Sequence, residues 1–315
     1  MVLPPPGILL LLLALLLSGC ATQTEAVRRD ANLPRRVELP STPFFAQERY
    51  QCGPAALAMV LAAAGIAVVP DELISQVYVP EREGSLPPEM LAAARRNGAL
   101  AMTIGSRLAD LLAEVSAGNP VLVLQNLSLP IFPLWHYAVV IGFDLDKGEL
   151  LLRSGTTERL VMPMSTFEHT WGRSNFWGMM ALPPSRLPVT ADENDMVSAL
   201  VAYEKVTIPE RARIAYDAAR QRWQHNLTLQ LGSGNAAYAA GDRRGALMAF
   251  RAAALDHPDS APAFNNLASV LAELGQLDEA RLAAQKAVAL GGPWRDTAAA
   301  TLARIEAQQT LKKRP

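Results

Sequence analysis

Residues 47–61 read Gln-Glu-Arg-Tyr-Gln-Cys-Gly-Pro-Ala-Ala-Leu-Ala-Met-Val-Leu. The apolar run after Cys52 predicts a helix that continues to Gly65, with Pro54 in its first turn, where a proline is well accommodated. Cys52 would then lie at the helix N-terminus, where unpaired N–H groups and the positive end of the helix dipole favour the thiolate. The stretch therefore predicts a nucleophilic cysteine with a pKa below that of a free thiol. The alternative is a small buried cysteine that only packs.

A nucleophilic cysteine needs a base, and His136 is the candidate among the four histidines. It lies in the run Trp-His-Tyr-Ala-Val-Val-Ile-Gly-Phe at residues 135–143, which predicts a buried strand. A cysteine followed downstream by a strand histidine is the order of papain-type enzymes, in which the fold assembles the pair. The other histidines share no spacing typical of metal sites, so we expect no metal and no cofactor.

The sequence around these two residues resembles the cysteine peptidases that remove double-glycine leaders from bacteriocin precursors. The resemblance covers roughly residues 40–183 and implies a papain-like α+β fold. It also implies that Cys52 is the nucleophile, His136 the general base and then acid, and Gln47 the oxyanion-hole side chain. Two positions depart from the family pattern. Gln47 lies five residues before the cysteine, where the family usually has six, and residues 152–155 read Leu-Arg-Ser-Gly where the family has an aspartate.

The residue that orients the histidine must therefore be sought among other polar groups. A hairpin centred on residues 146–147 would place Thr157 near His136 and Ser154 near Val139. Ser154, Thr156 and Thr157 are the candidates, and Ser154 is the one we select. Asp144 lies on the same strand as His136, about 26 Å away at full extension, which is too far for contact.

The amino-terminal residues predict a lipoprotein. Residues 8–17 form an apolar block that is short for a membrane span and typical of a signal peptide. The following Leu-Ser-Gly-Cys resembles the bacterial lipobox, which implies that residues 1–19 are removed and that Cys20 is acylated. The acyl chains would anchor the protein stably to a membrane. Because Ala21 follows, resemblance to lipoprotein sorting in Gram-negative bacteria implies the outer membrane, with the protein facing the periplasm.

Residues 20–39 are polar and charged, so we expect a tether between the membrane and a domain at residues 40–183. With Cys20 acylated, Cys52 has no partner for a disulfide. An unpaired cysteine in an oxidising compartment favours a catalytic role.

Beyond residue 183 the chain is rich in alanine and repeats with a period of 34 residues, as Ala212, Ala246 and Ala280 illustrate. This pattern resembles tetratricopeptide repeats and predicts an all-α solenoid of three repeats over residues 190–315, with a capping helix at residues 296–309. Such repeats imply that a protein partner or the substrate docks there. The alternative is a generic alanine-rich helical bundle.

The formal net charge of −1, from 29 basic and 30 acidic residues, gives no reason to expect a nucleic-acid partner. We predict a lipid-anchored cysteine peptidase that cleaves a peptide or protein substrate and carries a repeat domain for docking. One alternative is a catalytically inactive peptidase fold that binds peptides. Another is an acyltransferase or transglutaminase-like enzyme that uses the same Cys-His chemistry.

Overall fold

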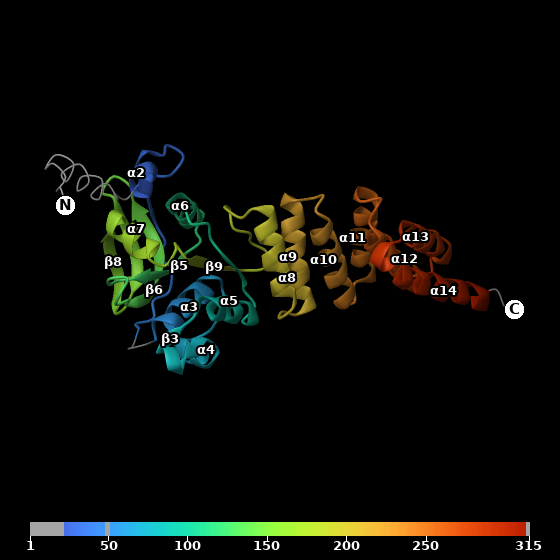
Figure 1. The fold of residues 1–315 in the computed structure, drawn as a ribbon, viewed down its shortest axis with the longest axis horizontal. Coiled ribbons are helices and arrows are strands. Elements are labelled where there is room, and N and C mark those ends of the chain that lie inside the picture. Colours follow the sequence, from blue (N-terminus) through green and yellow to red (C-terminus); the bar gives the residue numbers. More distant parts are fainter. Residues whose placement is uncertain (1–21, 48–50, 313–315) are drawn as a thin grey trace, which may run out of the picture. The chain divides into compact units, whose positions relative to one another are not determined.

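The computed structural model describes residues 22–47 and 51–312 (Figure 1). The chain divides into two compact units: the first ends at Pro183 and also includes residues 188–191, and the second comprises residues 184–187 and 192–315. The expected signal peptide and Cys20 lie outside the described residues. Within the described residues, no helix combines the length and the hydropathy needed to cross a membrane.

The first unit is built on an antiparallel sheet with the order β4-β9-β5-β6-β7-β8. β1 pairs with the carboxyl-terminal end of β6, at residues 142–144. The strands are β1 (Arg36–Glu38), β4 (Leu100–Thr103), β5 (Val121–Asn126), β6 (Trp135–Asp144), β7 (Glu149–Ser154), β8 (Thr157–Pro163) and β9 (Gly178–Leu182). The strand expected at residues 135–143 corresponds to β6. A separate two-stranded hairpin consists of β2 (Tyr78–Val79) and β3 (Gly84–Ser85), joined by η1 (Pro80–Arg82). This is the α+β architecture that the sequence predicted.

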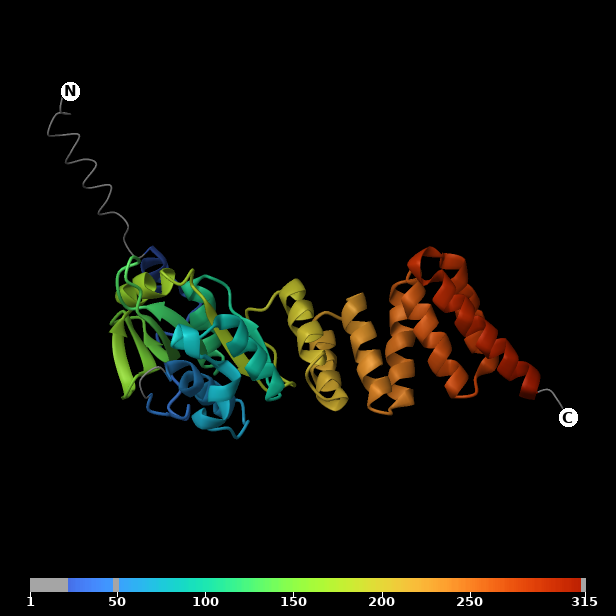
Figure 2. The same ribbon diagram turned by 60° about the horizontal axis from the view of Figure 1, so that its bottom comes forward.

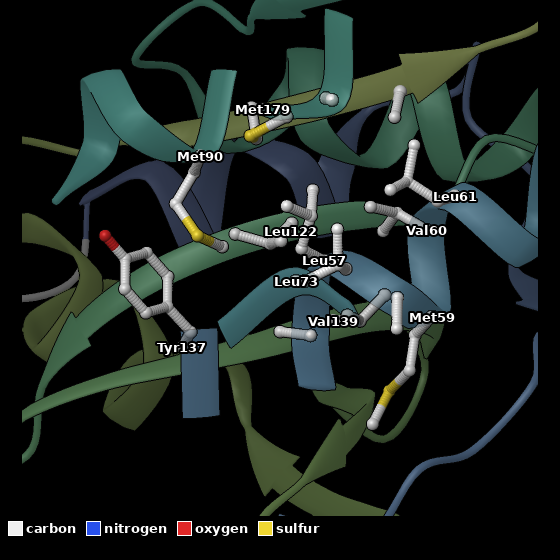
Figure 3. Close-up of a cluster of buried hydrophobic side chains, with 14 of the residues drawn as sticks. Leu57, Met59, Val60, Leu61, Leu73, Met90, Leu122, Tyr137, Val139 and Met179 are labelled. Carbon is white, nitrogen blue, oxygen red and sulfur yellow. The ribbon is translucent and has the colours of Figure 1, made fainter. Parts of the chain in front are cut away.

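Helix α3 (Cys52–Ala63) is the central helix of this unit and packs against β5, β6 and β9. Every residue from Gly53 to Leu61 is buried, as expected for a helix that is apolar on all sides. Figure 3 shows Leu57 and Val60 of α3 among side chains of the sheet. Fully burying a leucine stabilises the folded state by roughly 2 kcal/mol, so this core fixes the helix that carries Cys52.

Four further helices complete the layers around the sheet. α4 (Pro70–Val77) and α5 (Pro87–Arg96) pack with α3, whereas α6 (Leu108–Ser116) and α7 (Met164–Gly172) pack with β5 and with other parts of the sheet. The first two helices begin at a proline, a residue that is well accommodated in the first helical turn.

Residues 22–38 belong to the first unit, which corrects the expectation of a free tether at residues 20–39. α2 (Thr22–Arg29) packs with α6 and α7. Its amino end is capped by the buried carboxylate of Glu168 on α7, which accepts hydrogen bonds from the N–H groups of Gln23 and Thr24 and from the Thr24 hydroxyl. Local signals are also present, since Glu25 lies in the first turn and Arg28 and Arg29 in the last, but the capping carboxylate comes from far along the chain.

A bulge in β6 sets its register with β7. Phe143 pairs with Leu150, but Val140 pairs with Leu152, so Ile141 is the extra residue on β6. Gly142 lies beside it, and a Cβ atom there would approach the Val37 carbonyl of β1 to 2.5 Å. The bulge therefore needs a glycine at this position to keep β1 paired.

The second unit consists of helix pairs that repeat with the predicted period. Its helices are α8 (Glu193–Glu204), α9 (Pro209–Arg222), α10 (Leu227–Ala239), α11 (Arg243–Asp256), α12 (Ala261–Glu273), α13 (Leu277–Leu290) and α14 (Arg295–Lys312). The first helices of the three pairs begin at residues 193, 227 and 261, and the last helix, α14, begins at residue 295, so each start differs from the next by 34 residues. This is a tetratricopeptide-like array, and α14 takes the place expected for the capping helix (Figure 2).

We predict that a fragment of residues 190–315 folds alone, because helical repeats are stabilised by neighbouring repeats. In this fragment, Gly234→Ala should lower the free energy of unfolding by about 1–3 kcal/mol, because the added Cβ would approach the Phe250 ring to 2.3 Å. Urea denaturation followed by circular dichroism measures both effects. The neighbouring exposed substitution Asn235→Ala is the control. A random-coil spectrum of the parent fragment would contradict the prediction.

Candidate active site

The structure brings Cys52, His136 and Gln47 to one pocket of about 900 Å³. Cys52 is the first residue of α3 and is unpaired, and its side chain is partly buried. His136 is the second residue of β6, and Gln47 precedes the helix in the chain. Residues far apart in sequence therefore meet here because α3 packs directly on β6.

Ser154 contacts the histidine from β7. Its Oγ lies 2.8 Å from His136 Nε2, within hydrogen-bonding distance. The bulge in β6 makes this contact possible, because the pairing of Val139 with Arg153 places Ser154 opposite Ala138, on the same face as His136. Thr157, in contrast, pairs with Ser154 across the tight turn to β8, so the expectation that it lies near His136 through the β6–β7 hairpin is wrong.

Because Nε2 of His136 is bonded to Ser154, Nδ1 is the ring nitrogen that can accept the proton of the Cys52 thiol. For Nδ1 to accept a proton, Nε2 must carry its hydrogen and donate it to the Ser154 hydroxyl. A hydroxyl can also donate, so Ser154 permits both tautomers of His136, whereas a carboxylate would select one. The contacts among the described residues include no hydrogen bond between the Cys52 thiol and the His136 ring. The resting site therefore holds the two groups in one pocket without pairing them.

Gln47 is held by three hydrogen bonds to the neighbouring backbone. Its Nε2 donates to the Tyr137 carbonyl at 3.3 Å, and its Oε1 accepts from the Gly155 N–H at 3.1 Å. The backbone N–H of Gln47 also donates to the Gly155 carbonyl at 3.0 Å. Gly155 occupies the turn between β7 and β8 with a φ of +58°, a conformation that glycine adopts without strain. These contacts fix the amide in the pocket wall next to His136.

The electrostatics of the pocket differ from the sequence-based expectation. Burial raises the pKa of the Cys52 thiol, and this effect outweighs the lowering by backbone hydrogen bonds from Tyr137, Gly53 and Cys52 itself. Burial also lowers the pKa of His136. Both directions favour a neutral thiol beside a neutral imidazole. The predicted pKa below that of a free thiol is therefore wrong, because desolvation exceeds the effect of the helix N-terminus.

Two further segments line the pocket, and the first of them includes the charged residues Arg82 and Glu83. One is the β2–β3 hairpin and the start of α5, at residues 82–87, and the other is residues 133–135 at the start of β6. The first segment lies tightly on the nucleophile's helix, since a Cβ atom on Gly53 would come within 2.6 Å of the Ser85 Cβ. The Tyr137 hydroxyl donates to the Ser85 carbonyl at 3.1 Å and ties this hairpin to β6.

Tyr137, Gly155 and the β2–β3 hairpin were not selected from the sequence. Tyr137 and Gly155 act mainly through backbone groups, for which side-chain chemistry gives no signal. Their adjacency to His136 and Ser154 is the one sequence feature that could have indicated them. Among the described residues, no group of three or more His, Cys, Asp or Glu side chains could hold a metal ion.

Comparison with known proteins identifies the domain that carries this pocket. Residues 40–179 match the model of the Peptidase_C39 like family. These residues contain Gln47, Cys52, His136 and Ser154. No curated protein matches the chain.

Solved structures resemble each of the two units. A putative C39-like peptidase from Bacillus anthracis is 20% identical, with a TM-score of 0.40, over 47% of this chain and 98% of that chain. A double glycine motif protease from an AMS/PCAT transporter, in complex with the leader peptide, is 22% identical over 46% of this chain and 93% of that chain, with a TM-score of 0.35. The type III secretion translocator chaperone SycD of Yersinia enterocolitica is 18% identical over 38% of this chain and 86% of that chain, with a TM-score of 0.36.

We predict that alkylation of Cys52 by iodoacetamide has a pH midpoint above the value of about 8.5 for a free thiol, because burial disfavours the thiolate. His136→Ala should leave this midpoint nearly unchanged, since the resting groups are not paired. Mass spectrometry of the alkylated peptide measures the rate, and Cys52→Ser provides the blank. A midpoint below 7 that rises in His136→Ala would show instead that a thiolate–imidazolium pair exists.

Proposed function

We propose that this chain, whose residues 40–179 form a Peptidase_C39-like domain, is a cysteine peptidase that cleaves a peptide or protein substrate. The observation that carries the proposal is the convergence of Cys52, His136 and Gln47 on one pocket, with Ser154 bonded to the histidine. A nucleophile, a base and an oriented amide in one pocket are the parts that acyl transfer requires.

In the proposed reaction, His136 Nδ1 accepts the thiol proton as Cys52 Sγ attacks the scissile carbonyl. Apo geometries of this kind are often loose and tighten when substrate binds, so the absent thiol–imidazole hydrogen bond does not oppose this step. The resulting imidazolium donates its proton to the leaving amine as the carbon–nitrogen bond breaks and a thioester forms. Water, activated by His136, then releases the carboxylate and restores the thiol. Neutral resting groups suit this sequence, because the ion pair is needed only as the sulfur attacks.

The developing oxyanion would be held by two N–H donors. One is the backbone N–H of Cys52, which belongs to the first turn of α3 and has no acceptor within the helix. The other is Gln47, because a primary amide has two N–H groups and Tyr137 accepts one of them. The bonds to Gly155 hold this amide in place before substrate binds, which is the preorganisation that such a donor needs.

The sheet side of the pocket carries no ionised side chain, whereas Arg82 and Glu83 line the hairpin side, so we propose a substrate that is uncharged where it lies against the sheet. Residues 121–143, which include β5, β6 and the loop between them, contain no Asp, Glu, Lys or Arg. Apolar surface in the pocket also comes from Leu86, Pro87, Leu134 and Trp135.

The repeat unit would dock a protein partner or a remote part of the substrate. For the subcellular location, we propose that Cys20 is acylated and that the protein is attached to the outer membrane and faces the periplasm, as the lipobox indicates.

A second candidate function is peptide binding without cleavage. The raised pKa of Cys52 and the serine at position 154 favour it, because both reduce the readiness of the site for nucleophilic attack. A cysteine-directed epoxide probe separates the candidates. The peptidase should be labelled, and Cys52→Ala should not.

We predict that Ser154→Ala lowers kcat/KM about fivefold to tenfold, because it removes one hydrogen bond worth about 1 kcal/mol from the base. Ser154→Asp should keep or raise activity, because a carboxylate selects the productive tautomer. Gln47→Ala should lower kcat by about 10²–10³-fold as an oxyanion-hole donor is lost. Thr157→Ala, which changes the exposed partner of Ser154 across the turn, is the matched control. Hydrolysis of a fluorogenic peptide pool measures all four variants, and equal rates in Ser154→Ala and the parent would contradict the role of Ser154.

We predict that labelled palmitate enters the protein in a Gram-negative host and that Cys20→Ala abolishes the label. Cys52→Ala is the control and should label normally. Label retained in Cys20→Ala would exclude acylation at this residue.

A further inference from the structure

The structure determines how an anchor at Cys20 would orient the first unit. Thr22 begins α2, and two residues of extended chain span at most about 7 Å, so Cys20 must stay close to the start of this helix. The expected tether would have separated the domain from the membrane by up to twenty residues. With α2 docked, the membrane surface would instead lie next to the domain itself.

α2 is attached to the domain along its whole length. At its amino end, the Glu168 carboxylate, 8% exposed, accepts three hydrogen bonds from Gln23 and Thr24. The Gln23 side chain accepts from the Leu108 N–H at 2.6 Å, at the start of α6. In the middle of the helix, Val27 is buried. Breaking this arrangement would leave a buried carboxylate without partners, so α2 has a strong reason to stay docked.

The other end of α2 is bonded to the β6–β7 turn. Arg28 donates to the carbonyls of Leu145 and Asp146, and Arg35 forms an ion pair with the Asp146 carboxylate at 2.7 Å. This turn directly follows the last residue of β6. α2 therefore covers the end of the sheet at which β6 finishes.

The pocket lies at the opposite end of β6. His136 is the second residue of the strand and Asp144 the last, so about 26 Å of extended strand separates the pocket from the turn that α2 covers. Figures 1 and 2 agree on this placement, with α2 at one end of the first unit and α4 and the β2–β3 hairpin at the other.

We propose that the surface formed by α2 and the β6–β7 turn faces the lipid bilayer and that the pocket opens toward the aqueous side. Arg29 and Arg35 on this surface are paired with Glu25 and Asp146, so its charges are largely balanced and the acyl anchor, not attraction to anionic headgroups, would hold it at the bilayer. The inference rests on the proposed acylation of Cys20. It limits the substrates to polypeptides presented in the aqueous compartment, and excludes segments embedded in the bilayer that carries the anchor.

One surface feature could produce the opposite orientation. The β5–β6 loop, residues 127–134, exposes Ile131 and Phe132 at 75% and 74%, and exposed apolar loops are a common membrane contact. This loop leads into the first residue of β6, at the pocket end. An anchor held by α2 would keep it away from the same bilayer.

Energy transfer to a headgroup-labelled lipid distinguishes the two orientations. The acylated full chain, with Cys52→Ser, would be reconstituted in vesicles of phosphatidylethanolamine and phosphatidylglycerol. A donor dye would be placed at Lys147→Cys in the β6–β7 turn, which is far from Cys20 in the chain, or at Pro130→Cys in the β5–β6 loop. We expect clearly stronger transfer from position 147 than from position 130. Stronger transfer from position 130 would overturn the proposal in favour of the loop, and equal transfer would overturn it in favour of a free tether.

A second variant tests whether the docking of α2 causes the difference in energy transfer between the two positions. Glu168→Ala combined with Gln23→Ala should reduce the difference between the two positions, because α2 would be released. Glu210→Gln, an exposed carboxylate on α9, is the control and should preserve the difference. An undiminished difference in a folded double variant would overturn the role of α2. Vesicle flotation separates the premises: protein that does not float lacks the anchor, whereas protein that floats without an orientation difference retains the anchor and refutes only the orientation.

Discussion

The one-residue bulge in β6 is the constraint on which the candidate site depends. Without the extra residue at Ile141, the pairing of Phe143 with Leu150 would continue unchanged and place Ser154 opposite Val139. Paired residues share a face, so Ser154 would then point with Tyr137 and Val139 into the core under α3. The bulge moves Ser154 to the face of His136 and allows the hydrogen bond between them. A defect in the regular ladder thus assembles the polar part of the site.

Burial determines the charge state of this site. The N–H groups at the start of α3 stabilise a thiolate, but the same packing that fixes the helix removes water from the sulfur. Water is the stronger stabiliser of a charge, so the neutral thiol is favoured. Burial likewise lowers the pKa of the His136 imidazole, so the neutral form of the ring is favoured as well. A serine beside His136 is consistent with a neutral ring, because it offers no charge to stabilise an imidazolium at rest. Proton transfer is then coupled to attack on the carbonyl.

The sequence predicted the elements of the fold better than it predicted their environment. The strong periodicity of residues 135–143 and the apolar run after Cys52 fixed β6 and α3 within a residue or two. The sequence and its family resemblance also indicated four site residues that the structure brings together, namely Cys52, His136, Gln47 and Ser154. The pKa of Cys52 was mispredicted because it depends on burial by residues distant in the chain. α2 was missed for the same kind of reason, since its cap is Glu168 and not a neighbouring residue.

The repeat unit shows why a period can be clear when the residues at equivalent positions differ. Gly232 and Gly234 of α10 lie against the rings of Tyr216 and Phe250, where a Cβ atom would approach to within 2.4 Å. In the next repeat the counterpart of Phe250 is Ala284, and the counterpart of Gly234 is Ala268. The larger residue at position 268 thus accompanies the smaller one at position 284, although the methyl group gained is much smaller than the ring lost. The 34-residue spacing therefore survives as a pattern of small residues that set how closely two helices approach, and this pattern was sufficient to predict the period of the array.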